Sequence, residues 1–302
     1  MNKKRTKIIV TLGPATNTER DLRKIKDKGV DFVRVNMSHS SLEDLEYFIN
    51  LSQKVDIPFI IDTEGSQIRT GHLEGEAHYF KENDVVKIYA KTISGNSKKI
   101  CLRPGHVIEQ LEVGDLIHID FDTLVLRVTD ISTVAKGYVV GKAITGGLIG
   151  SNKAAVIDPV FTKKFQLPPL SPKDYQSIEL GLRAGIGHIA VSFVRSGASI
   201  DEVRSVTQNK MKIISKVECV DALEHINEII QKSDFILIDR GDLSKEIPIE
   251  KIPFTQKVII SKARRYNVGV YVATNLLETM IEKKKPTRAE VQDVVNTILA
   301  DP

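Results

Sequence analysis

The stretch Met211-Lys-Ile-Ile-Ser-Lys-Val-Glu218 decides the predicted fold, because an apolar strand ends there in a lysine and a carboxylate. Side chains alternate along a strand, so Lys216 and Glu218 lie on the same face. Such a pair suits a metal held by the carboxylate beside a cation that stabilises developing negative charge. For these eight residues alone, a surface ion pair at a strand end is the simpler interpretation. The other strands of the chain must decide between the two.

Upstream of this stretch, three short apolar segments alternate with segments of helical or loop character. The predicted strands are 7–11, 32–36 and 59–62. Thr16 and Glu19 form a capping-box pattern for the helix that follows the first strand. Strands that alternate with helices in this way are typical of a parallel sheet.

Residues 72–166 have a different texture. Apolar residues alternate over short runs, Gly and Asp separate these runs, and no good helix is predicted. The pattern indicates a small all-β lid domain, a β-barrel, inserted between residues 1–71 and 167–302. The end of this domain, residues 146–153, is rich in glycine and finishes with Lys153.

Downstream, the alternation of strands and helices returns. Ser171 followed by Pro172 starts a helix, and Thr287 with Glu290 forms a capping box for the last one. The predicted strands are 189–193, 212–216, 235–239 and 269–273. Together with the first three they predict an α/β fold, a TIM-type (β/α) barrel that is incomplete at seven strands.

Polar residues gather in the loops after the predicted strands, where (β/α) barrels place their reacting groups. Arginines, a lysine, carboxylates and small hydroxyls together suit a phosphate or carboxylate substrate bridged by a divalent metal. Structural roles compete with this interpretation, since Arg34 could pair with Asp62, Lys153 could be solvated and His39 could cap a turn. The loop residues are Arg34, Asn36, Ser38, Asp62, Thr63, Arg69, Lys216, Glu218, Arg240, Asp242 and Thr274.

Composition narrows the classes of function. The chain has 302 residues, a net charge of +4, no Trp and no apolar run that could span a bilayer. It has no basic stripe interleaved with aromatic residues, which argues against nucleic-acid binding. Cys101 and Cys219 match no metal or redox spacing, and the N-terminus does not resemble a signal peptide. We therefore expect a cytoplasmic protein that binds neither nucleic acid nor membrane.

Seven motifs, taken in order, resemble the pyruvate kinase family. Any one of them is weak evidence, but the ordered set covers nearly the whole chain, and a β-domain follows the third strand as it does in that family. The motifs are Thr6-Lys-Ile-Ile-Val-Thr-Leu-Gly-Pro14, Arg34-Val-Asn-Met-Ser-His39, Asp62-Thr-Glu-Gly-Ser-Gln-Ile-Arg-Thr-Gly71, Ile214-Ser-Lys-Val-Glu218, Asp239-Arg-Gly-Asp-Leu243, Ala273-Thr-Asn-Leu-Leu-Glu-Thr-Met280 and Lys285-Pro-Thr-Arg-Ala-Glu290.

The resemblance implies a role for each matching residue. Lys216 would stabilise the phosphoryl group in flight, and Arg34 would contact it. Thr274 would lie beside the carbon that is protonated to give pyruvate. Glu218 and Asp242 would bind a divalent metal, Mg²⁺ or Mn²⁺.

Further implied roles concern the monovalent cation and the nucleotide. The residues that match the K⁺ ligands of the family are Asn36, Ser38, Asp62 and Thr63. The residues expected to bind substrate or nucleotide are His39, Arg69, Lys153 and Gly241, together with Arg34, Asp242 and Thr274.

The sequence departs from the family pattern beside these residues. Glu64 stands where the family usually has lysine, and Gln67 matches neither the potassium-using nor the potassium-independent pattern. The usual glycine after Arg-Gly-Asp-Leu is Ser244, which Lys245 follows, and Asn275 replaces a glutamine. These changes together suggest an outlying member of the family.

The resemblance implies phosphoryl transfer from phosphoenolpyruvate to ADP, giving pyruvate and ATP. Two alternatives stay open: a divergent paralogue that acts on another enolpyruvate or 2-oxo acid, and a non-catalytic binding protein. The family's eighth strand and C-terminal domain do not follow here. We therefore expect a second copy or a partner chain to cover the open barrel edge, and no control by the sugar-phosphate effectors of that domain.

Overall fold

The computed structural model describes residues 6–158 and 165–300. The chain divides into two compact units, one made of Met1–Gly65 with Pro168–Pro302 and the other of Ser66–Leu167. Residues 66–71, which the sequence analysis grouped with the barrel, fall in the second unit. They do so because β4 (Arg69–Thr70) pairs antiparallel with β7 (Lys99–Arg103).

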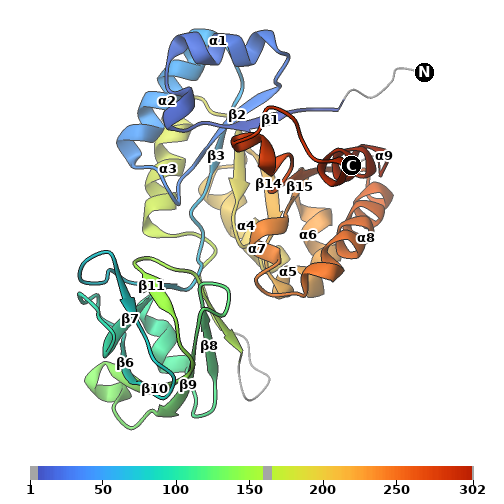
Figure 1. Cartoon of the computed structure of the whole chain (residues 1–302). Coiled ribbons are helices and arrows are strands. Elements are labelled where there is room, and N and C mark those ends of the chain that lie inside the picture. The colour runs from blue at the N-terminus through green and yellow to red at the C-terminus, as the bar shows by residue number, and fades with distance from the viewer. Residues whose placement is uncertain (1–5, 159–164, 301–302) are drawn as a thin grey trace. The chain divides into compact units, whose positions relative to one another are not determined.

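The first unit contains the curled sheet seen in Figure 1. Every neighbouring pair of its strands is parallel. The described part of the chain contributes seven strands to it, in the order β1-β2-β3-β13-β14-β15-β16. This confirms the prediction of an incomplete (β/α) barrel. The strands are β1 (Ile9–Thr11), β2 (Phe32–Asn36), β3 (Phe59–Asp62), β13 (His188–Val191), β14 (Lys212–Val217), β15 (Phe235–Asp239) and β16 (Gly269–Ala273).

Helices follow these strands and pack on one face of the sheet, where they share a large apolar core with it. The helices are α1 (Glu19–Asp27), α2 (Leu42–Val55), α3 (Pro172–Arg183), α4 (Gly197–Val206), α5 (Val220–Glu224), α6 (Ile226–Lys232), α7 (Arg240–Leu243), α8 (Ile252–Arg265) and α9 (Arg288–Leu299). Short 3₁₀ turns add η1 (Pro14–Thr16), η4 (Ile249–Lys251) and η5 (Glu278–Ile281).

The helix starts predicted at Ser171 and Thr287 are confirmed, and the one predicted at Thr16 is wrong. The Ser171 and Thr287 side chains each accept the expected backbone hydrogen bond from the third helical residue. The cap of α1, however, is Thr18, which accepts from the backbone N–H of Asp21, and not Thr16. The Thr16 hydroxyl is occupied in η1, where it accepts from the N–H of Gly13 at 3.0 Å.

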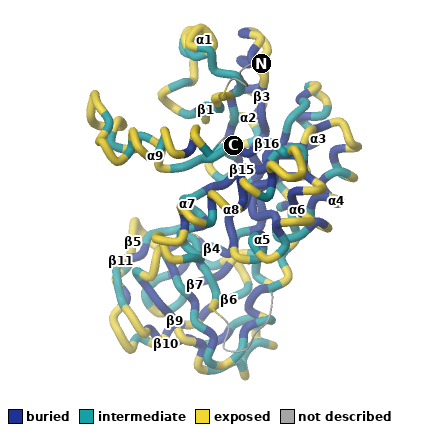
Figure 2. The backbone as a smooth tube through the Cα atoms, turned by 90° about the vertical axis from the view of Figure 1, so that its right-hand side faces the viewer, coloured by how far each residue is buried: buried dark blue, intermediate teal, exposed yellow. Residues whose placement is uncertain are grey.

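Alternation along β14 separates its side chains between two environments. Ile213 and Val217 join the core beneath the helices, whereas Ile214 faces the smaller cluster inside the curled sheet. Lys216 lies two residues after Ile214 and therefore faces the same interior. In Figure 2 strand β15, next to the edge strand β16, is largely buried, whereas much of α9 is exposed.

The second unit is all-β, with two further 3₁₀ turns, η2 (Gly105–Gln110) and η3 (Val134–Lys136). Its seven-stranded mixed sheet has the order β12-β8-β9-β10-β6-β7-β4 and curls into a nearly closed barrel around its own apolar core. A two-stranded sheet, β11-β5, completes it. The remaining strands are β5 (Ala77–Tyr79), β6 (Val85–Tyr89), β8 (Leu116–Ile119), β9 (Leu124–Asp130), β10 (Tyr138–Thr145), β11 (Leu148–Gly150) and β12 (Ala155–Asp158).

The parallel sheet has two open edges within the described residues, because β1 pairs only with β2 and β16 only with β15. Near the end of the chain, α9 exposes several apolar side chains, namely Val291, Val295, Ile298 and Leu299. No helix of residues 6–158 and 165–300 is long and apolar enough to cross a membrane.

Candidate active site

Lys216 lies at the centre of a charged cluster at the carboxyl end of the parallel sheet. Its side chain is only 4% exposed, and its ammonium lies 2.8 Å from Glu218 Oε1 and 3.2 Å from Asp62 Oδ1. Asp239 Oδ2 is 3.7 Å away. Asp62, Glu218 and Asp239 lie at the carboxyl ends of β3, β14 and β15. Strands β14 and β15 are adjacent in the sheet, and β13 separates β3 from β14. Lys216 and Glu218 thus share one face, as their spacing predicted.

Burial and charge act in opposite directions on this lysine. Burial alone would lower the pKa of the Lys216 ammonium, but Asp62, Glu218 and Asp239 outweigh it and raise the pKa above its usual value. The cation therefore stays charged in a buried place. Burial raises the pKa of Glu218 to about 8, although Lys216 acts in the opposite direction.

Arg34 supplies a second cation from the middle of β2. One guanidinium nitrogen, Nη1, lies 3.1 Å from Asp62 Oδ2, and Nε donates to Thr11 Oγ1 at 2.7 Å. Asp62 is fully buried and bridges Arg34 and Lys216 through its two oxygens. The ion pair between Arg34 and Asp62 that the sequence allowed is present, and it is continuous with the Lys216 cluster.

Ser192, which sequence reasoning missed, connects Lys216 to the end of β3. Its hydroxyl accepts from Lys216 Nζ at 3.0 Å and donates to the Thr63 carbonyl at 2.7 Å. Its backbone N–H donates to Thr63 Oγ1 at 2.9 Å. Position 65 requires a glycine, because a Cβ on Gly65 (φ +66°) would lie 2.8 Å from the Ser192 carbonyl oxygen. Ser192 lay inside the predicted strand 189–193, whereas β13 (His188–Val191) ends one residue before it.

Three carboxylates at this end of the sheet could hold a metal ion. Glu218, Asp239 and Asp242 each offer one oxygen, and these oxygens lie within 4.8 Å of one another. Hard oxygen donors of this kind suit Mg²⁺ or Mn²⁺, so the residues fit a divalent cation. Phe193 (φ +52°) donates its backbone N–H to Glu218 Oε2 at 2.7 Å and fixes that carboxylate. Asp239 was not among the predicted ligands.

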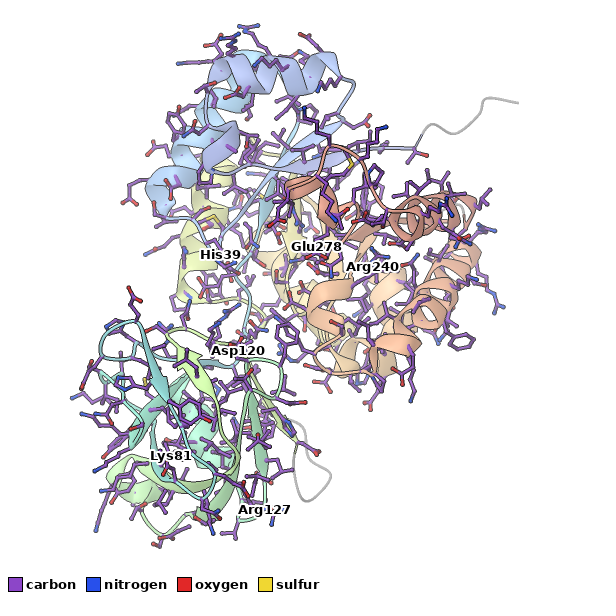
Figure 3. The ribbon with its side chains drawn as sticks, viewed as in Figure 1. His39, Lys81, Asp120, Arg127, Arg240 and Glu278 are labelled. Atoms are coloured by element: carbon purple, nitrogen blue, oxygen red, sulfur yellow. The ribbon has the colours of Figure 1, made fainter. Side chains whose placement is uncertain are left out.

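Thr274 and Gly241 meet beside these carboxylates. The Thr274 hydroxyl donates to Asp239 Oδ1, and a Cβ on Gly241 would lie 2.6 Å from Thr274 Cγ2. Burial opposes the charge of Asp239, but Lys216 and the bond from Thr274 hold the pKa of Asp239 below its usual value. Arg240, labelled in Figure 3, donates to the Thr274 carbonyl at 2.7 Å and to Asp293 of α9 at 2.8 Å.

The residues predicted to bind a monovalent cation lie at the ends of β2 and β3. Asn36 and Asp62 are register partners in these adjacent strands, and Asn36 Oδ1 accepts from the backbone N–H of Ser38 at 2.9 Å. His39, labelled in Figure 3, is exposed. Its backbone N–H donates to the Asn36 carbonyl, which fits the turn role that the sequence left open.

Glu64 lies against a lysine of α3. Lys173 Nζ is 3.5 Å from Glu64 Oε2 and donates to the Met37 carbonyl at 2.5 Å. The backbone N–H groups of Glu64 and Gly65 donate to Asp174, at 2.7 and 2.9 Å. The acidic residue at position 64 is therefore balanced by a neighbouring cation within the same unit.

The remaining predicted residues, Arg69 and Lys153, belong to the second unit, where they lie on paired segments. Thr70 donates its backbone N–H to the Lys153 carbonyl at 2.8 Å. Lys153 Nζ lies 2.9 Å from Asp120 Oδ2, and Arg69 donates to the Asn152 carbonyl at 3.0 Å. Asp120, labelled in Figure 3, thus forms an ion pair with Lys153, for which the sequence analysis also allowed a purely solvated role.

Comparison with known proteins identifies the family. A model of the family "Pyruvate kinase, barrel domain" matches residues 3–301, nearly the whole chain. The chain belongs to the pyruvate kinase family. The resemblance predicted from the ordered motifs is thereby confirmed.

Individual pyruvate kinases agree with this assignment. The pyruvate kinase of Thermotoga maritima is 35% identical over 308 residues, covering 97% of this chain and 64% of the relative. That of Methylorubrum extorquens is 34% identical over 301 residues, covering 98% and 62%. A crystal structure of a pyruvate kinase from Cryptosporidium parvum matches with a TM-score of 0.85 and 31% identity, over 98% of this chain and 63% of that one. The chain thus spans less than two thirds of the length of these relatives.

Proposed function

We propose that this chain transfers the phosphoryl group of phosphoenolpyruvate to ADP, giving pyruvate and ATP, in the cytoplasm. The observation that carries the proposal is the buried Lys216 ammonium, held at the carboxyl end of the sheet by Asp62, Glu218 and Asp239. Phosphoryl transfer depends on alignment and charge neutralisation more than on covalent chemistry. A fixed cation in a buried site supplies that neutralisation.

In this proposal the phosphorus–oxygen bond to the enolate oxygen breaks and a bond to the terminal phosphate oxygen of ADP forms. Lys216 and Arg34 stabilise the charge of the phosphoryl group during the transfer. The enolate then takes a proton at its methylene carbon, on the side where Thr274 lies. The Thr274 hydroxyl donates its own proton to Asp239, so a solvent water supplies the proton to the carbon, and the Thr274 oxygen accepts a hydrogen bond that positions this water.

Glu218 and Asp242 would hold the divalent metal, with Asp239 as a third carboxylate. A bound Mg²⁺ or Mn²⁺ supplies additional neutralisation of the phosphoryl oxygens. Phe193 keeps Glu218 in place through its backbone N–H, and Gly241 keeps the turn before Asp242 close to Thr274.

A monovalent cation such as K⁺ would bind Asn36, Ser38, Asp62 and the Thr63 carbonyl. Several of these oxygens already accept contacts within the chain, from Ser38 N–H, from Lys216 and Arg34, and from the Ser192 hydroxyl. We therefore propose that K⁺ assists the reaction without being required for it. The nucleotide would be bound by His39, Arg69 and Lys153.

The open edges of the sheet extend the proposal to assembly. The unpaired sides of β1 and β16 offer backbone donors and acceptors to a further strand, so a second copy or a partner chain would cover them. Light scattering of the purified chain tests this. A strictly monomeric protein that is fully active would contradict the expectation.

The deciding experiment measures pyruvate formation from phosphoenolpyruvate and ADP with Mg²⁺, with and without K⁺. Wild type should form pyruvate, and Lys216→Met should not. A folded wild-type protein that binds Mn²⁺ but forms no pyruvate would sink the proposal. Phosphate release that needs no ADP would instead favour a paralogue that acts on an enolpyruvate substrate without a nucleotide.

A further inference from the structure

Lys245 lies against one of the three carboxylates that could hold a metal. Its ammonium donates to Asp242 Oδ1 at 2.6 Å. The two residues are three apart, and the backbone N–H of Lys245 also donates to the Asp242 carbonyl at 3.0 Å. The turn that follows the short helix α7 therefore brings the lysine back over the carboxylate.

The surroundings make this contact stronger than an ordinary surface ion pair. The side chains of Lys245 and Asp242 are only 19% and 26% exposed, so water and salt screen them incompletely. The ammonium thus stands close to the place where a divalent cation would contact Asp242.

The role of Lys245 follows from the charge balance of Glu218, Asp239 and Asp242. Lys216 already balances Glu218 and Asp239, to which it lies at 2.8 and 3.7 Å. Lys245 gives the third carboxylate a cation of its own. All three metal-binding carboxylates therefore have a positive neighbour before any metal arrives, and an incoming divalent cation must approach an ammonium at short range.

We propose that Lys245 is a built-in competitor of the divalent metal, occupying the Asp242 carboxylate and lowering the affinity of the site for Mg²⁺ or Mn²⁺. The inference rests on the metal site of the proposed function. It assigns to Lys245 an electrostatic role that acts through its contact with Asp242 and needs no contact with substrate. Metal binding then becomes favourable chiefly when an anionic substrate adds negative charge to the same place.

The test titrates Mn²⁺ alone into wild type and variants, without substrate, and follows free Mn²⁺ by electron paramagnetic resonance. Lys245→Met should tighten binding roughly tenfold, because a like charge is removed from a poorly screened site. Lys245→Arg keeps the charge and should bind like wild type. Lys257→Met, which removes an exposed lysine of α8, is the matched control and should leave the Kd unchanged.

The opposite result would overturn the proposal. If Lys245→Met binds Mn²⁺ more weakly than wild type, or equally, the lysine orients Asp242 or is indifferent, and it does not compete. Circular dichroism confirms that each variant is folded.

A further variant separates this failure from failure of the proposed function. Asp242→Asn should weaken Mn²⁺ binding, and if it does not, Mn²⁺ binds elsewhere and the metal site itself is wrong. The Mn²⁺ titration is independent of turnover, so the Lys245 result stands even if no pyruvate is formed.

Discussion

The two ends of β14 place the same residue type in opposite environments. Lys212, at the amino end, is exposed to solvent, whereas Lys216, four residues later, is buried among carboxylates. Both ends belong to one regular strand, so the backbone does not distinguish them. The difference comes from what neighbouring strands present at each end: carboxylates follow β3 and β15 at the carboxyl end. A charged residue becomes part of a site when the adjacent strands supply its partners.

The largest expected difference between the two ends of β14 is in the effect of replacing each lysine on the free energy of unfolding. Lys216→Met leaves three carboxylates without their shared cation and should lower the free energy of unfolding by about 3–5 kcal/mol. Lys212→Met should change it by less than about 0.5 kcal/mol. Urea unfolding of both variants measures the difference. Similar losses for both would show that the buried cluster gives Lys216 no special role.

Carboxylates at the two ends should respond differently to metal. At about a hundred times its Kd, Mn²⁺ should raise the free energy of unfolding by about 2.7 kcal/mol. Glu218→Gln should remove this gain, because it removes a ligand of the proposed site. Asp234→Asn, at the amino end, where Asp234 pairs with Arg204, should keep it. Thermal unfolding with and without Mn²⁺ measures the effect, and an equal gain in both variants would contradict the assignment.

Two buried serines offer a finer contrast. Ser192→Ala leaves Lys216 without its hydroxyl acceptor and should cost about 1–3 kcal/mol of stability and lower kcat. Ser233→Ala, which removes bonds to Ser215 and to the Ile229 carbonyl, should cost a similar amount of stability without affecting kcat. Steady-state kinetics beside urea unfolding separates the two effects. Equal kcat values would leave Ser192 with a structural role only.

The smallest expected effect concerns Glu290, whose environment contrasts with that of buried Glu218. Glu290 accepts hydrogen bonds from Thr279 and Thr287, and these lower its pKa to about 2. Its contribution to stability is therefore complete above the unfolded pKa of about 4.5. It is lost as pH falls through about 2.

The variant Glu290→Gln tests this pH dependence. It should have a slightly lower melting temperature than wild type at pH 7, and the gap should narrow as pH falls from about 4.5 towards 2. Melting curves over this range give the answer. A gap that stays constant with pH would mean that the charge of Glu290 is not involved.

Much of the sheet was predictable because its signals are local. Alternation alone placed Lys216 and Glu218 on one face, and short apolar runs marked all seven strands. The Thr16 cap failed because two threonines, Thr16 and Thr18, each precede an acidic residue by three positions. Only the hydrogen bonds decide between them.

The parts of the candidate site that were missed depend on contacts between distant segments. Asp239 is the last residue of β15. Val217 of β14 and Ile238 of β15 are register partners, so the next residues, Glu218 and Asp239, are neighbours. Strand register could therefore have added Asp239 to the predicted metal ligands Glu218 and Asp242. Ser192 gave no separate signal, because the predicted strand 189–193 included it, whereas β13 ends at Val191. The contact of Lys245 with Asp242 depends on how the chain turns after α7, which no periodicity encodes.

The close approach of Gly241 to Thr274 has a consequence for how this family can vary. Because the Thr274 methyl group fills the space that a Cβ at position 241 would need, substitutions at the two positions should be coupled. A mutation of Gly241 to alanine should be accepted only in lineages where position 274 has already become smaller. Among relatives, a residue larger than glycine at the first position should therefore coincide with loss of threonine at the second.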